Sequence, residues 1–374
     1  MSEINFDGLI GPTHNYSGLS EGNNASKKNF SSPSNPKNAA LQGIKKAETL
    51  IASGLKQGFF LPHERPFIPG LKKLGFNGTD EEILSSAFDH SKVLLSNFSS
   101  ASSMWAANAA TVSPSPDTQD DKVHLTPANL NTMFHRSIET EFTHQQCKII
   151  FPKNYFEIHN SAPTISGYGD EGAANHLRIS KSHNEKGFEI FVYGESGFKN
   201  DKTSVKRQAL EVSRSIAFNH KLDMENTFFL QQNHQAVKEG SFHNDIVSLS
   251  NESVFIAHEN AFQNRDDLNK MLNILKSKID NFQYIEISHS EIPLKDIISS
   301  YLLNSQLITN GDNEMQLILP EEVKGYENCM SWLDKLKQIS DVKLFDFVDI
   351  RQSMMNGGGP ACLRLKLILN DEEL

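Results

Sequence analysis

Short strand and helix patterns alternate through the second half of the chain, and their order restricts the possible folds. One predicted helix places Leu268, Leu272, Leu275 and Ile279 on a single face, and Asn264 is its predicted N-cap. The predicted strands cover residues 188–193, 227–230, 245–250, 253–257, 282–287, 315–319, 342–348 and 362–369, and the other helices cover 38–55, 203–219, 294–304 and 326–339. This strand–strand–helix–strand order fits neither a doubly wound sheet nor a barrel of eight equal units. It favours a single α/β domain built from similar modules.

The charge balance argues against polyanionic partners. In 374 residues, 36 Lys and Arg face 46 Asp and Glu, which gives a net charge of −10. There is no long basic run, so binding to nucleic acid or to an anionic membrane is disfavoured. No apolar stretch reaches membrane-spanning length, and the N-terminal residues have no signal-peptide pattern. We therefore expect a cytoplasmic protein.

Three glycines precede one of the three cysteines, in the segment Asn356-Gly-Gly-Gly-Pro-Ala-Cys362. Consecutive glycines mark backbone that turns sharply or approaches a ligand closely. A thiol at this turn, at the start of the predicted strand, could be a nucleophile stabilised by backbone N–H groups. It could equally be a small buried residue, whereas a phosphate loop would need a Gly-Lys-Ser/Thr ending. Cys147 and Cys329 lie in apolar surroundings and are predicted to be structural.

Two further segments carry residues suited to chemistry. If residues 242–247 are extended, His243 and Asp245 point to the same face, as a base beside a cation-binding carboxylate or as a plain surface pair. Residues 169–176 place Asp170 and Glu171 between glycines, which is also the pattern of a tight acidic turn. Known zinc and calcium motifs are missing, so a metal is discounted. The first ~35 residues are rich in Gly, Asn and Ser and are predicted to form a loop.

These segments, in this order, resemble the N-succinylarginine dihydrolase family. The resemblance extends to five other blocks and covers essentially the whole chain. The blocks are residues 5–20 (NFDGLIGPTHNYSGLS), 62–69 (PHERPFIP), 104–111 (MWAANAAT), 123–131 (VHLTPANLN) and 134–137 (FHRS). The family belongs to the guanidine-modifying enzymes of the pentein fold. The resemblance therefore implies an α/β propeller of five strand–helix modules around a pseudo-fivefold axis, with the active site at the axis.

The resemblance also implies roles for individual residues. Cys362 would be the nucleophile, with His243 and Glu171 as catalytic partners. The implied substrate contacts are Ser17, Gly18, Leu19, Ser20, Glu21, Gly22, Asn23, Asn24, Ala25, Ser26, Asn108, His135, Arg136, Arg207, Asp245 and Asn356. Whether Glu171 orients the substrate or His243 stays open at this point.

The implied reaction belongs to the arginine succinyltransferase pathway of arginine catabolism. It converts N2-succinyl-L-arginine to N2-succinyl-L-ornithine, two ammonia and CO2 without a cofactor. The resemblance implies a homodimer and one catalytic domain over residues 1–374, without the family's usual C-terminal extension. The alternatives are an arginine deiminase-like enzyme, an amidinotransferase, a metallohydrolase and a catalytically inactive, truncated relative.

Overall fold

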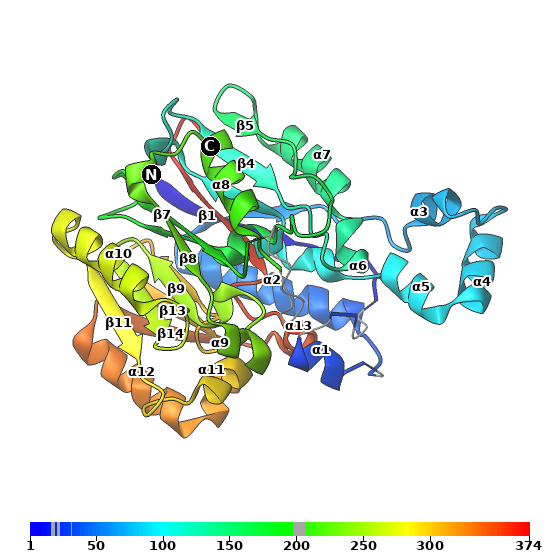
Figure 1. The fold of residues 1–374 in the computed structure, drawn as a ribbon. Helices are drawn as coiled ribbons and strands as arrows, with labels where there is room; N and C mark the ends of the chain where they lie inside the picture. Colours follow the sequence, from blue (N-terminus) through cyan, green and yellow to red (C-terminus); the bar gives the residue numbers. More distant parts are fainter. Residues whose placement is uncertain (16–18, 21–22, 31, 197–206) are drawn as a thin grey trace.

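Five three-stranded sheets form the body of the protein in a computed structural model that describes residues 1–15, 19–20, 23–30, 32–196 and 207–374 (Figure 1). The orders are β15-β1-β2, β3-β4-β5, β6-β7-β8, β9-β10-β11 and β12-β13-β14. The strands are β1 Ser2–Gly8, β2 Lys56–Phe60, β3 Ala110–Ser113, β4 Val123–Pro127, β5 Phe156–Ile158, β6 His176–Ile179, β7 Phe188–Tyr193, β8 Thr227–Gln231, β9 Ser248–Asn251, β10 Val254–His258, β11 Gln283–Ile287, β12 Gln306–Thr309, β13 Met315–Pro320, β14 Val342–Val348 and β15 Arg364–Leu369. The five-module architecture implied by the resemblance is thus present.

Every sheet has the same connectivity. The first strand pairs antiparallel with the middle strand, and the middle strand pairs parallel with the third. Parallel neighbours need a crossover, and a helix supplies it in each module, namely α2, α7, α8, α10 or α12. The first module is completed by the last strand, because β15 pairs with β1 from Ser2↔Leu369 to Asp7↔Arg364. This pairing closes the ring and joins the two ends of the chain.

The helices cover the outside of the ring, and α3 to α5 project from it as a separate arm (Figure 1). Their bounds are α1 Asn24–Lys28, α2 Pro36–Ala52, α3 Ile68–Lys73, α4 Asp80–His90, α5 Lys92–Phe98, α6 Phe134–Ser137, α7 Thr140–Ile150, α8 Leu210–Asn219, α9 His234–Glu239, α10 Arg265–Lys278, α11 Leu294–Ser300, α12 Glu327–Ile339 and α13 Arg351–Met354. Short 3-10 turns include η2 Ala106–Asn108, η4 Gly172–Asn175 and η6 Asn244–Ile246. The arm has its own small apolar cluster around Leu71 and Ile83.

The predicted face of α10 is confirmed. Leu268, Leu272, Leu275 and Ile279 are all buried in the main apolar cluster. The Asn264 side chain accepts hydrogen bonds from the backbone N–H groups of residues 266 and 267, which would otherwise lack partners at the helix start. The apolar spacing and the cap together fix the start and orientation of this helix.

Three local predictions were wrong. The region predicted as an N-terminal loop contains the strand β1, which was missed because it carries polar residues. One of them, Asp7, is buried and pairs with Lys46, whose Nζ lies 2.6 Å from the carboxylate. Residues 245 and 246 belong to the 3-10 turn η6 rather than to a strand, so the same-face argument for His243 and Asp245 does not hold. Cys362 lies in a turn two residues before β15 rather than at its first residue.

Other element boundaries also shift. The strand β12 was not predicted, and α11 ends at Ser300 rather than near residue 304. Of the helix predicted over 203–219, residues 203–206 lie outside the described residues and the helix begins at Leu210. Cys147 and Cys329 are buried in apolar clusters, as predicted.

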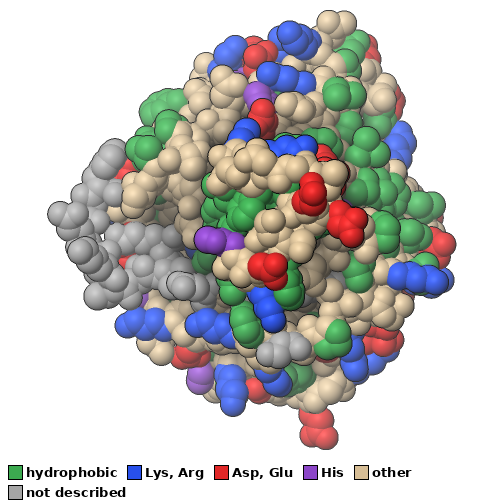
Figure 2. Space-filling model, turned by 90° about the vertical axis from the view of Figure 1, so that its right-hand side faces the viewer, with side chains coloured by type: hydrophobic (Ala, Val, Ile, Leu, Met, Phe, Trp, Pro, Cys, Tyr) green, Lys and Arg blue, Asp and Glu red, His purple; other side chains and the backbone are tan. Residues whose placement is uncertain are grey.

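The surface properties agree with the charge analysis. None of the helices in the described part of the chain is long and apolar enough to cross a membrane. On the face shown in Figure 2, basic and acidic side chains are interspersed rather than gathered into one basic field.

Candidate active site

The three glycines before Cys362 allow the side chains of Asn23, Trp105 and Asn304 to pack closely against the cysteine loop. Gly357 has φ +96°, and a Cβ there would meet the Asn23 side chain. A Cβ on Gly358 would lie 2.1 Å from Nε1 of Trp105, and one on Gly359 would lie 2.5 Å from Oδ1 of Asn304. Any side chain at these positions would push the loop away from its neighbours. The glycines therefore serve packing around the thiol as well as turning the chain.

The Cys362 thiol lies against a carboxylate. Its Sγ is 3.4 Å from Oδ2 of Asp245, and the thiol is only 2% exposed. The side chain of Asn304 also hydrogen-bonds to the thiol, and its Nδ2 donates to the backbone oxygen of Asp245 at 3.1 Å. Cys362, Asp245 and Asn304 come from three different modules and meet at the centre of the ring.

The surroundings keep this thiol protonated. Burial and the nearby Asp245 carboxylate raise the pKa of Cys362 well above its usual value, against weaker opposing hydrogen bonds from Asn304 and the Gly359 backbone. Burial likewise raises the pKa of Asp245. A thiolate beside a carboxylate needs a compensating positive charge. A cation bound next to Cys362 and Asp245 would therefore favour ionisation of the thiol.

Glu171 and His243 form a second buried pair. Glu171 Oε2 lies 2.9 Å from Nε2 of His243, and Glu171 Oε1 accepts a hydrogen bond from the Thr132 hydroxyl at 2.7 Å. The direct contact favours the interpretation in which Glu171 orients His243, leaving Nδ1 of His243 buried without a partner among the described residues. Burial raises the pKa of Glu171, but His243, Arg207 and Arg136 outweigh it and lower the pKa to about 2. Glu171 is therefore a permanent anion at neutral pH.

Two buried arginines flank this pair. Arg136 Nη1 lies 3.5 Å from Glu171 Oε2 and donates to Oδ1 of Asn108 at 3.1 Å. Its Nε and Nη2 are buried and have no hydrogen-bond partner in the described part of the chain. The guanidinium of Arg207 lies over the ring of Phe242, 4.7 Å from its centroid. A buried guanidinium with N–H donors left over, such as that of Arg136, suits the binding of a carboxylate.

His135 adds a neutral donor or acceptor at the edge of this group. Its Nε2 lies 3.4 Å from the hydroxyl of Ser20. Burial, together with Arg136 and Arg207, lowers the pKa of His135 to about 3, so the ring is uncharged at neutral pH. It can then orient an anion or an amide without adding a third positive charge.

These residues surround one small pocket. It is lined by Ser20, Asn23, Trp105, Asn108, Arg136, Arg207, Phe242, His243, Asn356, Gly357 and Cys362. Asn23 Nδ2 donates to the backbone oxygen of Asn356 at 2.8 Å and so fastens the N-terminal loop to the cysteine loop. Of the other predicted contacts, Leu19, Asn24, Ala25, Ser26, His135 and Asp245 do not line this pocket, although His135 and Asp245 contact the lining residues Ser20 and Cys362. Ser17, Gly18, Glu21 and Gly22 lie outside the described residues.

Several contacts were missed by the sequence analysis. Trp105 lies within a block that carried the resemblance, yet nothing singled it out as a pocket residue. Gln208 accepts from the Glu171 backbone N–H at 2.7 Å, and its position next to Arg207 was the available signal. Asn304 gave no local signal, since a lone Asn after a helix is usually a cap or turn residue.

No metal-binding cluster of three or more His, Cys, Asp or Glu side chains occurs in the described ranges of the chain. The pocket lining contains a thiol, an imidazole, three amide side chains and two guanidinium groups, and the carboxylates of Asp245 and Glu171 contact the thiol and the imidazole. This set can supply a nucleophile, a proton carrier and binding groups for both charges on a zwitterionic ligand.

Comparison with known proteins decides the family. The family model described as succinylarginine dihydrolase matches residues 1–374. The chain belongs to this family. An N-succinylarginine dihydrolase of Acinetobacter baumannii is 45% identical over 379 residues, covering 100% of this chain and 85% of the relative. One from Photorhabdus laumondii is 46% identical over 384 residues, covering 99% and 85%.

Solved structures agree on the fold of this succinylarginine dihydrolase family member. The N-terminal domain of ArgZ, an arginine dihydrolase of cyanobacteria, aligns with TM-score 0.59 at 13% identity and covers 98% of each chain. A dimethylarginine dimethylaminohydrolase adduct aligns with TM-score 0.53 at 13% identity, over 98% of this chain and 100% of the other. The protein is thus an α/β propeller of the pentein type.

Proposed function

We propose that this protein hydrolyses N2-succinyl-L-arginine to N2-succinyl-L-ornithine, two ammonia and CO2, with Cys362 as the nucleophile. Family membership over the full chain supports the substrate. The observation that carries the mechanism is that Cys362 and His243 line one pocket, and that each of them contacts a carboxylate, Asp245 or Glu171. Of the other predicted contacts, Ser20, Asn23, Asn108, Arg136, Arg207 and Asn356 line the same pocket and are proposed to bind the substrate.

The charges of the pocket match those of the substrate. Succinylarginine carries one guanidinium and two carboxylates, and an acidic protein binds such an anion only where arginines are placed locally. Arg136 and Arg207 bind the carboxylates, supported by His135 and Asn108. Asp245 binds the guanidinium beside Cys362. The buried, unpartnered nitrogens of Arg136 among the described residues support this assignment.

The substrate itself activates the thiol. The guanidinium enters next to Cys362 and Asp245, and its positive charge lowers the cost of forming a thiolate there, so that His243 can accept the thiol proton. The thiolate attacks the guanidinium carbon. His243 then gives a proton to the departing nitrogen, so that ammonia leaves and a cationic thiouronium adduct stays on the sulfur.

Water completes the first round. His243, held by Glu171, takes a proton from water as its oxygen attacks the adduct carbon. The carbon–sulfur bond breaks, the thiolate is restored, and N2-succinyl-L-citrulline remains. A second round on the ureido carbon releases another ammonia, and the resulting carbamate loses CO2. Each round consumes one water and releases one ammonia, and no electrons are transferred.

The assembly and location follow the same resemblance. We expect a homodimer in the cytoplasm that acts on this small molecule and binds neither nucleic acid nor membrane. Analytical ultracentrifugation at micromolar concentration tests the dimer, and a monomer would contradict it.

Ammonia counting tests the reaction. Purified protein is incubated with a limiting amount of succinylarginine, ammonia is measured enzymatically, and the products are identified by mass spectrometry. We expect two ammonia per substrate and succinylornithine as the product. One ammonia with a ureido product would instead identify a deiminase. Amidino transfer would require an acceptor amine, and a metallohydrolase would lose activity on dialysis against a chelator.

A further inference from the structure

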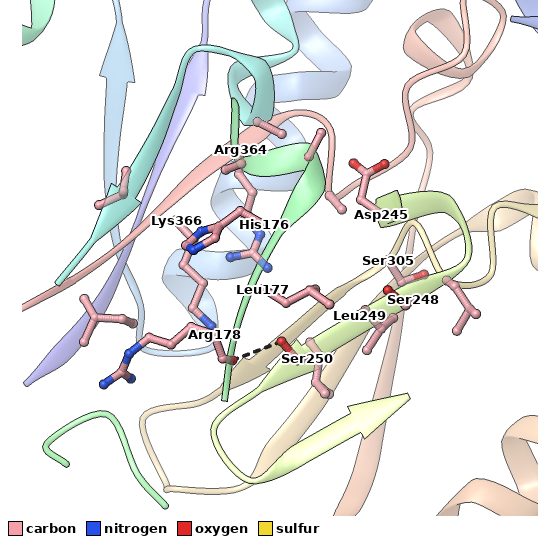
Figure 3. A pocket seen from close by; sticks show the side chains of 18 of the residues that line it. His176, Leu177, Arg178, Asp245, Ser248, Leu249, Ser250, Ser305, Arg364 and Lys366 are labelled. Atoms are coloured by element: carbon pink, nitrogen blue, oxygen red, sulfur yellow. Dashed lines mark hydrogen bonds between the residues drawn. The ribbon is translucent and has the colours of Figure 1, made fainter. Parts of the chain in front are cut away.

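A second, larger cavity lies on the axis of the ring, behind the cysteine loop. Each of the five sheets contributes its inner strand to the wall, through Val112, Leu177, Leu249, Leu307 and Lys366. Figure 3 shows Arg364, Lys366, His176 and Leu177 around this common space, with Asp245 at one end. The cavity therefore follows from the fivefold arrangement itself, and the proposed mechanism does not use it.

The inner end of this cavity borders the catalytic pocket. Asp245 and Ala361 line it, whereas Cys362 and His243 line the pocket on the other side. The two spaces are separated by the contact of 3.4 Å between Cys362 Sγ and Asp245 Oδ2. Asp245 is only partly buried, although Cys362 and His243 in front of it are almost fully buried. The Asp245 side chain thus contacts the thiol on one side and lines the axial cavity on the other.

The outer end is polar and leads towards the opposite face. Lys366 Nζ lies 3.2 Å from Glu3 Oε2, and Glu3 also lines a further cavity with Met1, His183 and Glu252. Arg364 and Lys366 bring positive charge into the axial space, and the hydroxyl of Ser305 in its wall is buried without a partner among the described residues. Most of the cavity lining is apolar, so Arg364, Lys366 and the Ser305 hydroxyl are the groups that can hold water there.

We propose that this axial cavity is the route by which water reaches the thiol and ammonia leaves it while the succinyl-amino acid stays bound in front. The inference rests on the proposed function, which requires two waters to enter and two ammonia molecules to leave for each substrate. The substrate occupies the small pocket lined by Cys362 and His243. On that side, Asn23 of the N-terminal loop donates a hydrogen bond to the backbone oxygen of Asn356. Ammonia passes as the neutral molecule, since Arg364 and Lys366 repel ammonium.

Retention of the ureido intermediate is the measurable consequence. If water and ammonia exchange from behind, N2-succinyl-L-citrulline need not leave between the two rounds. Blocking the axis forces the exchange through the front, so the intermediate must depart first. A loss of overall activity would not distinguish the two routes. The fraction of N2-succinyl-L-citrulline that is released between the two rounds does distinguish them.

Ser250 offers a matched pair of variants. It lies on β9 in the cavity wall, is partly exposed, and donates a hydrogen bond to the Arg178 backbone oxygen at 3.1 Å (Figure 3). Ser250→Ala removes that hydrogen bond and leaves the space open. Ser250→Met removes the same hydrogen bond and fills the space. Comparing them separates the effect of plugging from that of the lost contact.

The experiment is isotope trapping. Carbon-labelled succinylarginine is converted in the presence of excess unlabelled succinylcitrulline, and label in the free citrulline pool is compared with label in CO2. We expect little trapping by the wild type and by Ser250→Ala, and severalfold more by Ser250→Met. Equal trapping by all three proteins overturns the axial route, even where two ammonia are released. A wild type that releases one ammonia or none contradicts the proposed function instead.

A crystal structure of the wild type provides a second, activity-independent measurement. We expect ordered waters from Asp245 to Lys366, interrupted in Ser250→Met. A dry axial cavity in the wild type overturns the proposal, whether or not the methionine variant folds.

Discussion

The replacement of Glu171 by Gln tests the electrostatic balance of the site. Gln keeps the shape of the side chain but removes the only charge that the structure gives as a direct partner of both His243 and Arg136. The pKa of Glu171 is lowered from 4.5 to about 2, which corresponds to about 3 kcal/mol of stabilisation of the ionised form in the folded protein. Independently of this pKa, removing one partner of a buried ion pair lowers the free energy of unfolding by about 3–5 kcal/mol.

The sign of the pH dependence follows from the lowered pKa. A carboxyl group whose pKa falls on folding stabilises the protein above its unfolded value and loses that contribution as the pH drops. The wild type should therefore be more stable than Glu171→Gln by about 3 kcal/mol at pH 7. The difference should shrink between pH 4.5 and about 2, as Glu171 becomes protonated.

Urea unfolding of both proteins from pH 7 to pH 3 measures this difference. Glu141→Gln, in the first turn of α7, is a control because Glu141 is exposed and lies outside the pocket. Ammonia release should also fall sharply in Glu171→Gln, since His243 loses the group that orients it. A stability difference that stays constant with pH, or a variant as stable as the wild type, would refute the argument.

Three further substitutions probe other parts of the site. Cys362→Ser should abolish ammonia release while leaving the melting temperature nearly unchanged, whereas Cys329→Ser should keep activity. Ammonia release at the wild-type rate by Cys362→Ser would disprove the nucleophile. Arg207→Ala should raise KM for succinylarginine far more than for arginine, and an equal rise for both would argue against carboxylate binding. Asn304→Ala should raise the pKa of Cys362 further, because the side chain of Asn304 opposes the effect of burial and favours the thiolate. Its iodoacetamide alkylation at fixed pH should slow accordingly, and an unchanged rate would mean that Asn304 does not stabilise the thiolate.

The residues of the site differ in how clearly the sequence indicates them. The glycine-rich turn makes Cys362 a candidate nucleophile, but from the turn alone it could equally be a small buried residue. The resemblance supplies Glu171, His243 and the arginines, which local patterns leave undecided between functional and structural roles. The strand argument for His243 and Asp245 fails because η6 changes the direction of the side chains, a choice that local alternation cannot detect.

The sequence by itself determined the modular α/β architecture, the core face of α10, the buried cysteines and the identity of the family. The architecture, the helix face and the buried cysteines follow from periodicity, capping and apolar surroundings, which are local properties of the chain, whereas the family was inferred from a resemblance over the whole sequence. Only the tertiary structure decided that β1 pairs with β15, that Asn304 contacts the thiol, that Glu171 holds His243, and that five inner strands enclose an axial cavity. Each of these is a contact between residues far apart in the chain, and its energy depends on packing and burial that no local pattern encodes.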